Sequence, residues 1–151
     1  MLEKSLVQVV FDRGIYLPEM DLWLDARARR ELSFVSHAHT DHLARHSAAI
    51  LTPATLALAQ PALGGVRSRA LEYGEALEAE RYTLTLHPAG HCLGAAQVLV
   101  QSRATGERVL YTGDLKLSPN PTAPSVEPVP CDTLIIESTY GKPQYRFPPD
   151  E

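Results

Sequence analysis

The sequence lacks most of the features that mark secreted or membrane proteins. It has only two cysteines, Cys92 and Cys131, and because they form no CxxC pair we expect no disulfide framework and two reduced thiols. No hydrophobic run approaches the length of a membrane span, and the first apolar stretch, Leu6 to Phe11, is too short for a secretory signal. These absences predict a cytoplasmic protein with no membrane-spanning segment.

An excess of positive charge is also missing. The chain has 14 Lys and Arg against 18 Asp and Glu, so no long-range field attracts the phosphates of a nucleic acid. Any contact with nucleic acid must therefore be local. Arg27, Arg29 and Arg30 are the one candidate basic stripe, which we interpret as a solvated turn between two strands.

The length and composition are those of one folded domain. A chain of 151 residues is too short for two independent cores. Its 44% of hydrophobic and 21% of charged residues are ordinary globular values, which excludes a disordered or collagen-like chain. We therefore expect residues 1–151 to form a single domain.

Short apolar runs bounded by turn residues predict a protein rich in β-sheet. Leu6 to Phe11 and residues 15–17 should form a hairpin around the turn Asp12-Arg13-Gly14. Further strands are expected at residues 22–24, 32–36, 69–73, 82–87, 97–100, 109–112 and 133–136. We expect the four strands between residues 69 and 112 to be neighbours in one sheet, and the strand 133–136 to be buried.

Helical patterns are fewer. One helix is expected at residues 41–47, and a second at residues 53–60, where Thr52 suits the N-cap and Pro53 the first helical position. The proline-rich passage from Ser118 to Pro130 should be an extended surface connection, because proline lacks the backbone N–H that helices and strands use.

Four potential metal ligands stand in the segment from Ser36 to His42, directly after a predicted strand. Side chains two positions apart in an extended segment point the same way, so His37 and His39 can converge on one ion. Asp41 and His42, at the bend that follows, can face a second ion. The pattern H-x-H-x-D-H therefore predicts two adjacent metal sites.

Two residues farther along the chain complete this interpretation. His91 lies between Gly90 and Gly94, which allow an unusual turn and a close approach of the backbone. Asp114 follows the predicted strand 109–112, so its carboxylate projects from a strand end. The remaining histidines, His46 and His87, we interpret as structural.

The resulting donor set contains imidazoles and carboxylates without thiolates, which suits zinc, with manganese or iron as alternatives. The first ion would take His37, His39 and His91, the second Asp41 and His42, and both would share Asp114. Two such ions about 3.5 to 4 Å apart would lower the pKa of a bound water toward roughly 7. The implied chemistry is hydrolysis.

This pattern resembles the metallo-β-lactamase superfamily, whose H-x-H-x-D-H signature stands at residues 37–42. Asp25 matches the aspartate that precedes the signature in that family, His91 its third motif and Asp114 its fourth. The segment 134–141, which contains Glu137, resembles the acidic motif of the β-CASP nucleases. The stretch from His87 to Gln97 looks most like the bacterial branch of RNA-processing and DNA-ligase-associated nucleases.

The resemblance implies an α/β (α+β layered) fold, the amino-terminal half of an αββα sandwich with mostly antiparallel or mixed sheet and few helices. Residues 1–151 would be one partial domain, with the β-CASP insertion and the carboxy-terminal half absent, so the second ion would lack one ligand. In the family's terms Asp25 would orient a ligand histidine or the metal-bound water, and Asp41 would accept a proton from that water besides binding the second ion. Glu137 would hold the leaving-group acid in a complete relative and would be idle in this chain.

Three functions remain open from the sequence. The first is a metal-dependent phosphodiesterase acting on RNA or single-stranded DNA, which the motif around Glu137 favours. The second is a small-molecule hydrolase of the same superfamily, such as a thioesterase or lactonase. The third is a truncated, non-catalytic metal-binding module. A half sandwich would also expose an apolar sheet face, so we expect a homo-oligomer or a partner chain to cover it.

Overall fold

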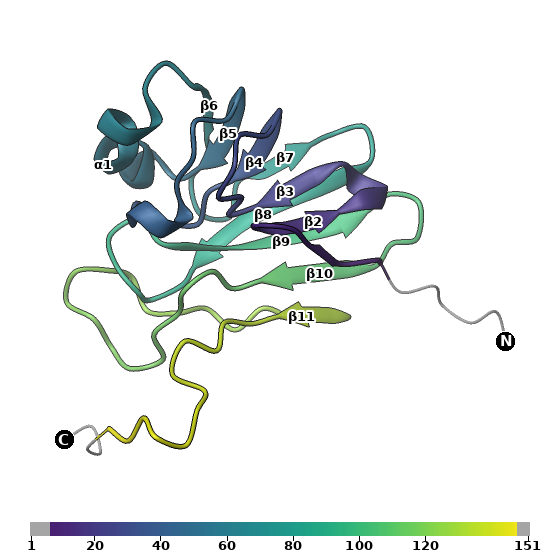
Figure 1. The fold of residues 1–151 in the computed structure, drawn as a ribbon. Helices are drawn as coiled ribbons and strands as arrows, with labels where there is room; N and C mark the ends of the chain where they lie inside the picture. Colours follow the sequence, from purple (N-terminus) through teal and green to yellow (C-terminus); the bar gives the residue numbers. More distant parts are fainter. Residues whose placement is uncertain (1–6, 148–151) are drawn as a thin grey trace, which may run out of the picture.

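The computed structural model describes residues 7–147 (Figure 1). In that part of the chain the strands are β1 (Val10–Phe11), β2 (Ile15–Leu17), β3 (Leu22–Leu24), β4 (Leu32–Phe34), β5 (Ala48–Leu51), β6 (Arg67–Ala70), β7 (Ala76–Glu78), β8 (Tyr82–Pro88), β9 (Ala96–Ser102), β10 (Arg108–Tyr111) and β11 (Thr133–Ile135). One α-helix, α1 (Pro53–Leu63), and two 3-10 turns, Pro18–Met20 and Thr40–His42, complete the described elements.

The strands form two mixed sheets. The first has the order β1-β2-β3-β4-β5-β6 and the second the order β11-β10-β9-β8-β7. Alternating apolar side chains of both sheets meet in one core, in which Leu24 and Phe34 of the first sheet join Leu84, Val98 and Val109 of the second. These five side chains are fully buried. The chain is therefore a two-layer sandwich built by the period-two pattern of its strands.

The helix α1 covers part of the outer face of the first sheet. Ala59 and Leu63 of α1 pack with Val35, Ala49 and Leu51 in a second, smaller core. The helix also makes the crossover between the parallel strands β5 and β6. It begins as the sequence predicts, because the Thr52 hydroxyl accepts a hydrogen bond from the backbone N–H of Thr55 at 3.2 Å and Pro53 stands at the first helical position.

Removing this cap should lower the free energy of unfolding. Thr52→Ala deletes the acceptor for Thr55 N–H and a hydrogen bond of 2.8 Å from the Thr52 hydroxyl to Gly94 O. We expect a loss of about 1–2 kcal/mol, read from the shift of the urea midpoint at constant slope. An unchanged midpoint would show that the cap contributes nothing.

Five strand ends place side chains at one edge of the sandwich. The strands β3 and β4 are parallel, so their carboxyl ends lie together and are followed by Asp25 and His37. The strands β8 and β10 both run antiparallel to β9, so they share a direction, and His91 and Asp114 follow them. The strand β11 runs parallel to β10 and leads to Glu137.

Several predicted elements are present. The hairpin forms between β1 and β2 around the predicted turn, although β1 is only Val10–Phe11 and Leu6 lies outside the described residues. The strands near residues 22, 32, 82, 97 and 109 are found, and the passage 118–130 contains no helix or strand. The two cysteines are unpaired. Few helices and mixed sheets agree with the expected fold class.

Three expectations are wrong. Residues 41–47 form only the 3-10 turn Thr40–His42, because no side chain caps it and Leu43 returns to an extended conformation. The strand expected at 69–73 is β6, which pairs with the unpredicted β5 in the first sheet and so does not neighbour β8. The strand 133–136 is not buried: it forms an edge of its sheet, and Leu134 and Ile136 are 52% and 58% exposed.

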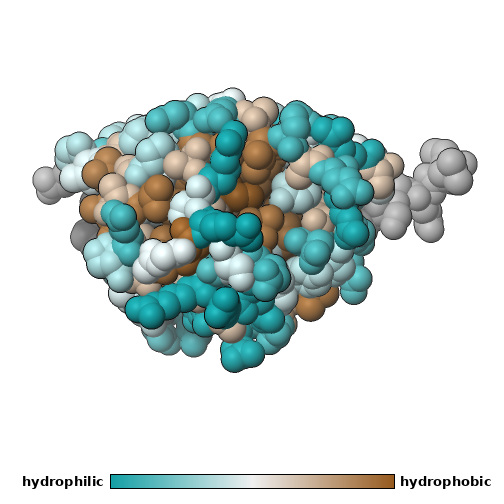
Figure 2. Space-filling view, turned by 90° about the horizontal axis from the view of Figure 1, so that it is seen from above, coloured by the Kyte–Doolittle hydropathy of each residue, from teal (hydrophilic) through white to brown (hydrophobic). Residues whose placement is uncertain are grey.

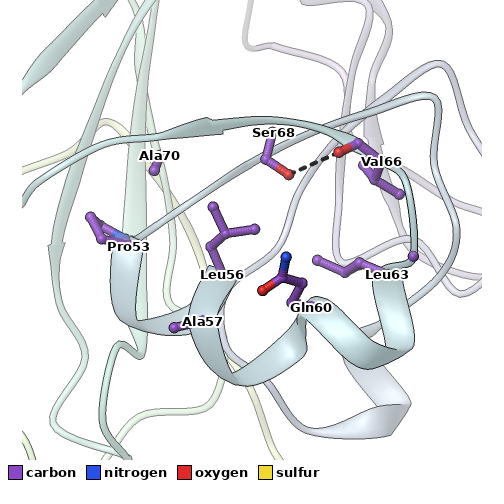
Figure 3. A pocket seen from close by; sticks show the side chains of 9 residues that line it. Pro53, Leu56, Ala57, Gln60, Leu63, Val66, Ser68 and Ala70 are labelled. Atoms are coloured by element: carbon purple, nitrogen blue, oxygen red, sulfur yellow. Dashed lines mark hydrogen bonds between the residues drawn. The ribbon is translucent and has the colours of Figure 1, made fainter.

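One cavity lies away from the strand ends that carry the histidines. It has a volume of about 450 Å³ and opens between α1 and β6, with Leu56, Leu63 and Val66 in its lining (Figure 3). Seen from the top of Figure 1, hydrophobic residues gather near the middle of the surface between polar ones (Figure 2).

No helix within residues 7–147 is long and apolar enough to cross a membrane. The predicted oligomer or partner chain stays a prediction.

Candidate metal centre

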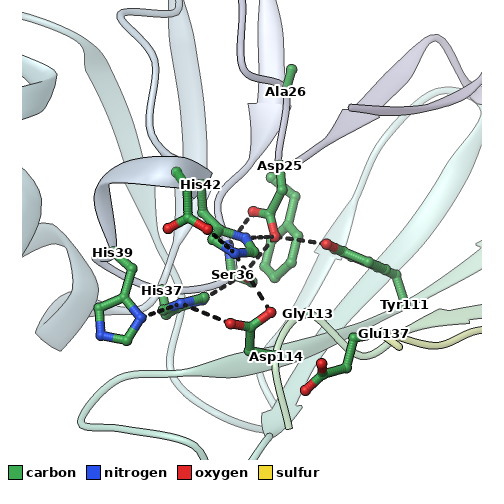
Figure 4. A network of polar contacts seen from close by, with 12 residues as sticks. Asp25, Ala26, Ser36, His37, His39, His42, Tyr111, Gly113, Asp114 and Glu137 are labelled. Atoms are coloured by element: carbon green, nitrogen blue, oxygen red, sulfur yellow. Dashed lines mark hydrogen bonds and ion pairs between the residues drawn. The ribbon is translucent and has the colours of Figure 1, made fainter. Parts of the chain in front are cut away.

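Three histidines and one aspartate come together at the shared edge. The ligand atoms of His37, His39, His91 and Asp114 all lie within 4.8 Å of one another. His39 Nδ1 is 2.9 Å from His37 Nε2 and 3.3 Å from His91 Nε2. Asp114 Oδ2 is 3.7 Å from His37 Nε2 and 3.8 Å from His91 Nε2. Figure 4 shows the His37, His39 and Asp114 side chains pointing toward one another.

This spacing fits a four-coordinate divalent cation. Nitrogen and oxygen ligands bind such an ion at about 2.0–2.2 Å, so in a tetrahedron they lie about 3.3–3.6 Å apart. The contacts of 2.9–3.8 Å within the cluster bracket that value. The group therefore provides three imidazole nitrogens and one carboxylate oxygen at the separation that a single ion requires.

Asp114 also faces a second pair of ligand candidates. Its other oxygen, Oδ1, lies 3.5 Å from His42 Nε2, and His42 Nε2 lies 3.5 Å from Asp41 Oδ2. The carboxylate of Asp114 thus stands between the first cluster and the pair Asp41 and His42. This is the arrangement in which one carboxylate can bridge two cations.

Asp25 supports this centre through hydrogen bonds to the residues around it. Its side chain is 5% exposed and accepts four hydrogen bonds. Asp25 Oδ1 accepts from Ser36 N–H at 2.7 Å, and Oδ2 accepts from the Ser36 hydroxyl, His42 Nδ1 and the Tyr111 hydroxyl at 2.6, 2.8 and 2.8 Å (Figure 4). Because His42 Nδ1 donates to Asp25, its Nε2 is left free to face Asp41 and Asp114.

Ser36 sets the tautomer of His37 in the same way. The Ser36 hydroxyl donates its proton to Asp25 Oδ2, so its oxygen accepts from His37 Nδ1 at 2.9 Å. That leaves the lone pair of His37 Nε2 directed toward His39 and Asp114. Gly113 makes room for this contact, because a Cβ there would come within 2.6 Å of the Ser36 Cβ.

Ser36 and Tyr111 are site residues that the sequence interpretation missed. Ser36 directly precedes the signature, and Tyr111 lies three positions before Asp114, so proximity to the motifs was the only signal available. Tyr111 and Asp25 are 86 residues apart in the chain, and their hydrogen bond follows from sheet packing.

The electrostatics favour the metal-binding form of His37 and oppose that form at His42 and Asp114. Burial lowers the pKa of His37 to about 3, with the neighbouring His42 acting in the same direction, so His37 stays neutral near pH 7. Burial alone would lower the pKa of His42, but its hydrogen bond to Asp25 and nearby carboxylates outweigh burial and raise it. Burial raises the pKa of Asp114. Each of these groups would be stabilised in its ligand form by a positive charge at the centre.

The loop that carries His91 is fixed from two sides. Gly90 and Gly94 have φ of 75° and 82°, and a Cβ at Gly90 would overlap the Lys116 carbonyl. Asn120 Nδ2 donates to His91 O at 2.7 Å, which ties the loop to the proline-rich passage. The two glycines therefore serve the close approach that their positions predicted.

Glu137 lies outside the cluster. Its Oε1 accepts from Leu115 N–H at 3.0 Å and its Oε2 from Thr139 N–H at 3.2 Å. Burial would raise its pKa, but hydrogen bonds from Thr139 and from Leu115 N–H lower it. The carboxylate therefore braces the segment after Asp114, and Figure 4 shows it on the far side of Asp114 from His39.

His46 and His87 are not part of the cluster. His46 Nδ1 accepts from Arg30 N–H at 3.3 Å, and His87 Nδ1 is 3.3 Å from Glu127 Oε2. In each ring the Nε2 atom is buried and finds no partner among residues 7–147. Both histidines stand apart from the metal candidates, as expected, but neither is fully hydrogen-bonded.

Comparison with known proteins gives three informative relatives, while no protein-family model matches. A probable DNA ligase from Opitutus terrae is 42% identical over 146 residues, or 93% of this chain and 14% of the relative. Endoribonuclease YSH1 from Candida glabrata is 37% identical over 47% of this chain and 9% of the relative. Transcription termination factor FttA from Thermococcus kodakarensis is 39% identical over 54% and 13%. The chain thus spans less than a sixth of each of these three proteins.

A two-sheet sandwich that carries an H-x-H-x-D-H loop at one edge, with a histidine and an aspartate supplied by later strands, defines the metallo-β-lactamase class of protein. The chain belongs to this superfamily, in its β-CASP branch, with the probable DNA ligase, YSH1 and FttA as relatives. A solved protein of unknown function from Enterococcus faecalis gives only a weak likeness, with a TM-score of 0.49 at 19% identity over 57% of this chain and 25% of that one.

Proposed function

We propose that this chain carries the metal centre of a nuclease, a phosphodiesterase that hydrolyses RNA or single-stranded DNA with two zinc-type ions. The observation that supports the proposal most is the position of Asp114 between two groups of ligand candidates. The name of the endoribonuclease among the relatives supports nucleic acid as the substrate class. Manganese and iron are the alternative metals that the same donor set would accept.

The residues divide into binding, bridging and positioning roles. His37, His39 and His91 would hold the first ion and Asp41 and His42 the second, with Asp114 shared. Bound cations of this kind supply Lewis-acid activation of water and of the phosphodiester.

The remaining roles belong to carboxylates. Asp41 is exposed and stands 3.5 Å from His42, so it is placed to accept a proton from the attacking water. Asp25 is buried behind His42 and acts through it, by fixing the direction of the ring. Glu137 would act indirectly, by holding the segment that follows Asp114.

The first experiment measures metal content. The protein as purified should contain about two equivalents of zinc by elemental analysis, and a chelator should remove both the metal and cleavage of a single-stranded oligonucleotide. His39→Ala should lose at least one equivalent, because His39 Nδ1 contacts two other ligand candidates. His39 is exposed, so this change leaves the core intact, and circular dichroism checks that the fold is retained.

A histidine outside the cluster provides the matched control. His87→Ala removes the same side chain from β8 and should keep the wild-type zinc content and cleavage rate. Equal and negligible metal in wild type, His39→Ala and His87→Ala would contradict the proposed centre. Cleavage of thioester or lactone substrates with no cleavage of oligonucleotides would keep the centre but contradict the nuclease function.

A further inference from the structure

A small recess adjoins the metal centre on the side of the β1–β2 hairpin. It has a volume of about 60 Å³, and its inner wall includes Asp25, His42 and Tyr111. Its rim includes Phe11 of β1 and Arg27. The recess has room for about two water molecules, so a larger group cannot enter it and must lie across the rim.

Phe11 is unusually open for an aromatic side chain. It is 80% exposed, the highest value among the large hydrophobic residues within residues 7–147. Single exposed apolar residues are common and need no explanation by themselves. Phe11 differs because it lines a recess that also contains His42, one ligand candidate of the metal centre, and Asp25, which orients the His42 ring.

Arg27 brings a positive charge to the same rim. Its backbone N–H donates to Arg13 O at 2.7 Å, which fixes its position against the turn of the hairpin. Its side chain is exposed and forms no ion pair within the described part of the chain.

The other two arginines of the basic cluster do not share this position. Arg30 forms an ion pair of 2.8 Å with Asp12 and lies 3.6 Å over the ring of Trp23, so its charge is used within the fold. Arg29 is exposed and does not line the recess. The three arginines, which the sequence predicts to lie in one solvated turn, therefore have three different surroundings in the structure.

We propose that Phe11 and Arg27 form a contact surface for a single-stranded nucleic acid that enters the metal centre. The guanidinium binds a backbone phosphate, and the phenyl ring stacks on an adjacent unpaired base. A duplex hides its base faces, so this surface discriminates in favour of single strands. The inference rests on the proposed nuclease function and names the substrate form that the centre receives.

The test measures binding without cleavage. The anisotropy of a labelled single-stranded oligonucleotide is titrated in chelator with wild type, Phe11→Ala and Arg27→Ala. Phe11→Ala should weaken binding about 5- to 100-fold and leave the affinity for an abasic strand of the same length unchanged. Phe11→Trp, which keeps an aromatic face, should bind the oligonucleotide with an affinity close to that of the wild type. Arg27→Ala should make the slope of log affinity against log salt shallower by about 0.7, the value for one phosphate contact.

Arg29→Ala is the matched control, since it removes the same charge from the same segment away from the recess. It should keep the salt slope of the wild type. Wild-type affinity of Phe11→Ala, or equal effects of Arg27→Ala and Arg29→Ala, would overturn the inference. If zinc-loaded wild type cleaves oligonucleotides and Phe11→Ala and Arg27→Ala cleave them at the same rate, the nuclease function is supported and this contact surface is refuted. Binding that depends on Phe11 and Arg27, but without cleavage, would contradict the nuclease function alone.

Discussion

Asp114→Asn should abolish most phosphodiester cleavage. Asp114 is the one residue whose two carboxylate oxygens face both groups of ligand candidates, at 3.5–3.8 Å from His37, His42 and His91. Changes that only disturb the support of a metal ligand reduce affinity or activity about 10- to 100-fold, so loss of a shared ligand should exceed that and lower kcat/KM about 10³-fold. The zinc content should fall from about two equivalents to below one.

Two substitutions make this result specific. Asp41→Asn affects only the pair with His42, so it should keep about one equivalent of zinc while cleavage falls. Glu80→Gln removes a negative charge from an exposed residue two positions before β8, at the far end of that strand from His91, and should change neither quantity. Full zinc content and normal cleavage in Asp114→Asn would refute the bridging role.

Asp25→Ala should be the most destabilising single change at the centre. Asp25 is 5% exposed and accepts four hydrogen bonds, so its removal leaves Ser36, His42 and Tyr111 with buried donors that lack an acceptor. We expect a loss of about 3–5 kcal/mol in the free energy of unfolding, measured by urea denaturation. Zinc affinity should fall as well, because the His42 ring is no longer oriented.

Asp21→Ala is the control for the backbone of Asp25. Asp21 and Asp25 both have a left-handed backbone, with φ of 51° and 45°, so alanine meets a similar conformational penalty at either position. Asp21 is exposed and accepts one hydrogen bond, from Tyr16, and its substitution should cost only about 1–2 kcal/mol. Equal losses in the two variants would show that the buried network adds nothing beyond backbone strain.

The local patterns in the sequence were sufficient for the elements in which neighbouring residues decide the conformation. The hairpin of β1 and β2 and the start of α1 were predicted because turn and cap residues act within a few positions. Strand pairing was predicted less well. The short strand β5 (Ala48–Leu51) has no alternating pattern, so it was missed, and its partner β6 was assigned to the wrong sheet.

The helix expected at residues 41–47 does not form, and the reason is again a tertiary contact. Its pattern was compatible with a helix, but Asp25 holds the His42 ring, and Leu43 is extended immediately after the turn. A tertiary hydrogen bond outweighs the weak helical preference of such a short segment. The exposed strand β11 likewise depends on its place at a sheet edge, which its apolar residues do not encode.

The sequence by itself determined which side chains were candidates for the centre, because the H-x-H-x-D-H pattern places four of them in one loop and their chemistry selects a metal ion. Only the tertiary structure decided that His91 and Asp114 meet that loop, that Ser36 and Tyr111 support it through Asp25, and that Arg27 lines the recess beside it while Arg30 does not. These contacts join segments up to 86 residues apart. They follow from the packing of two sheets, which no local pattern specifies.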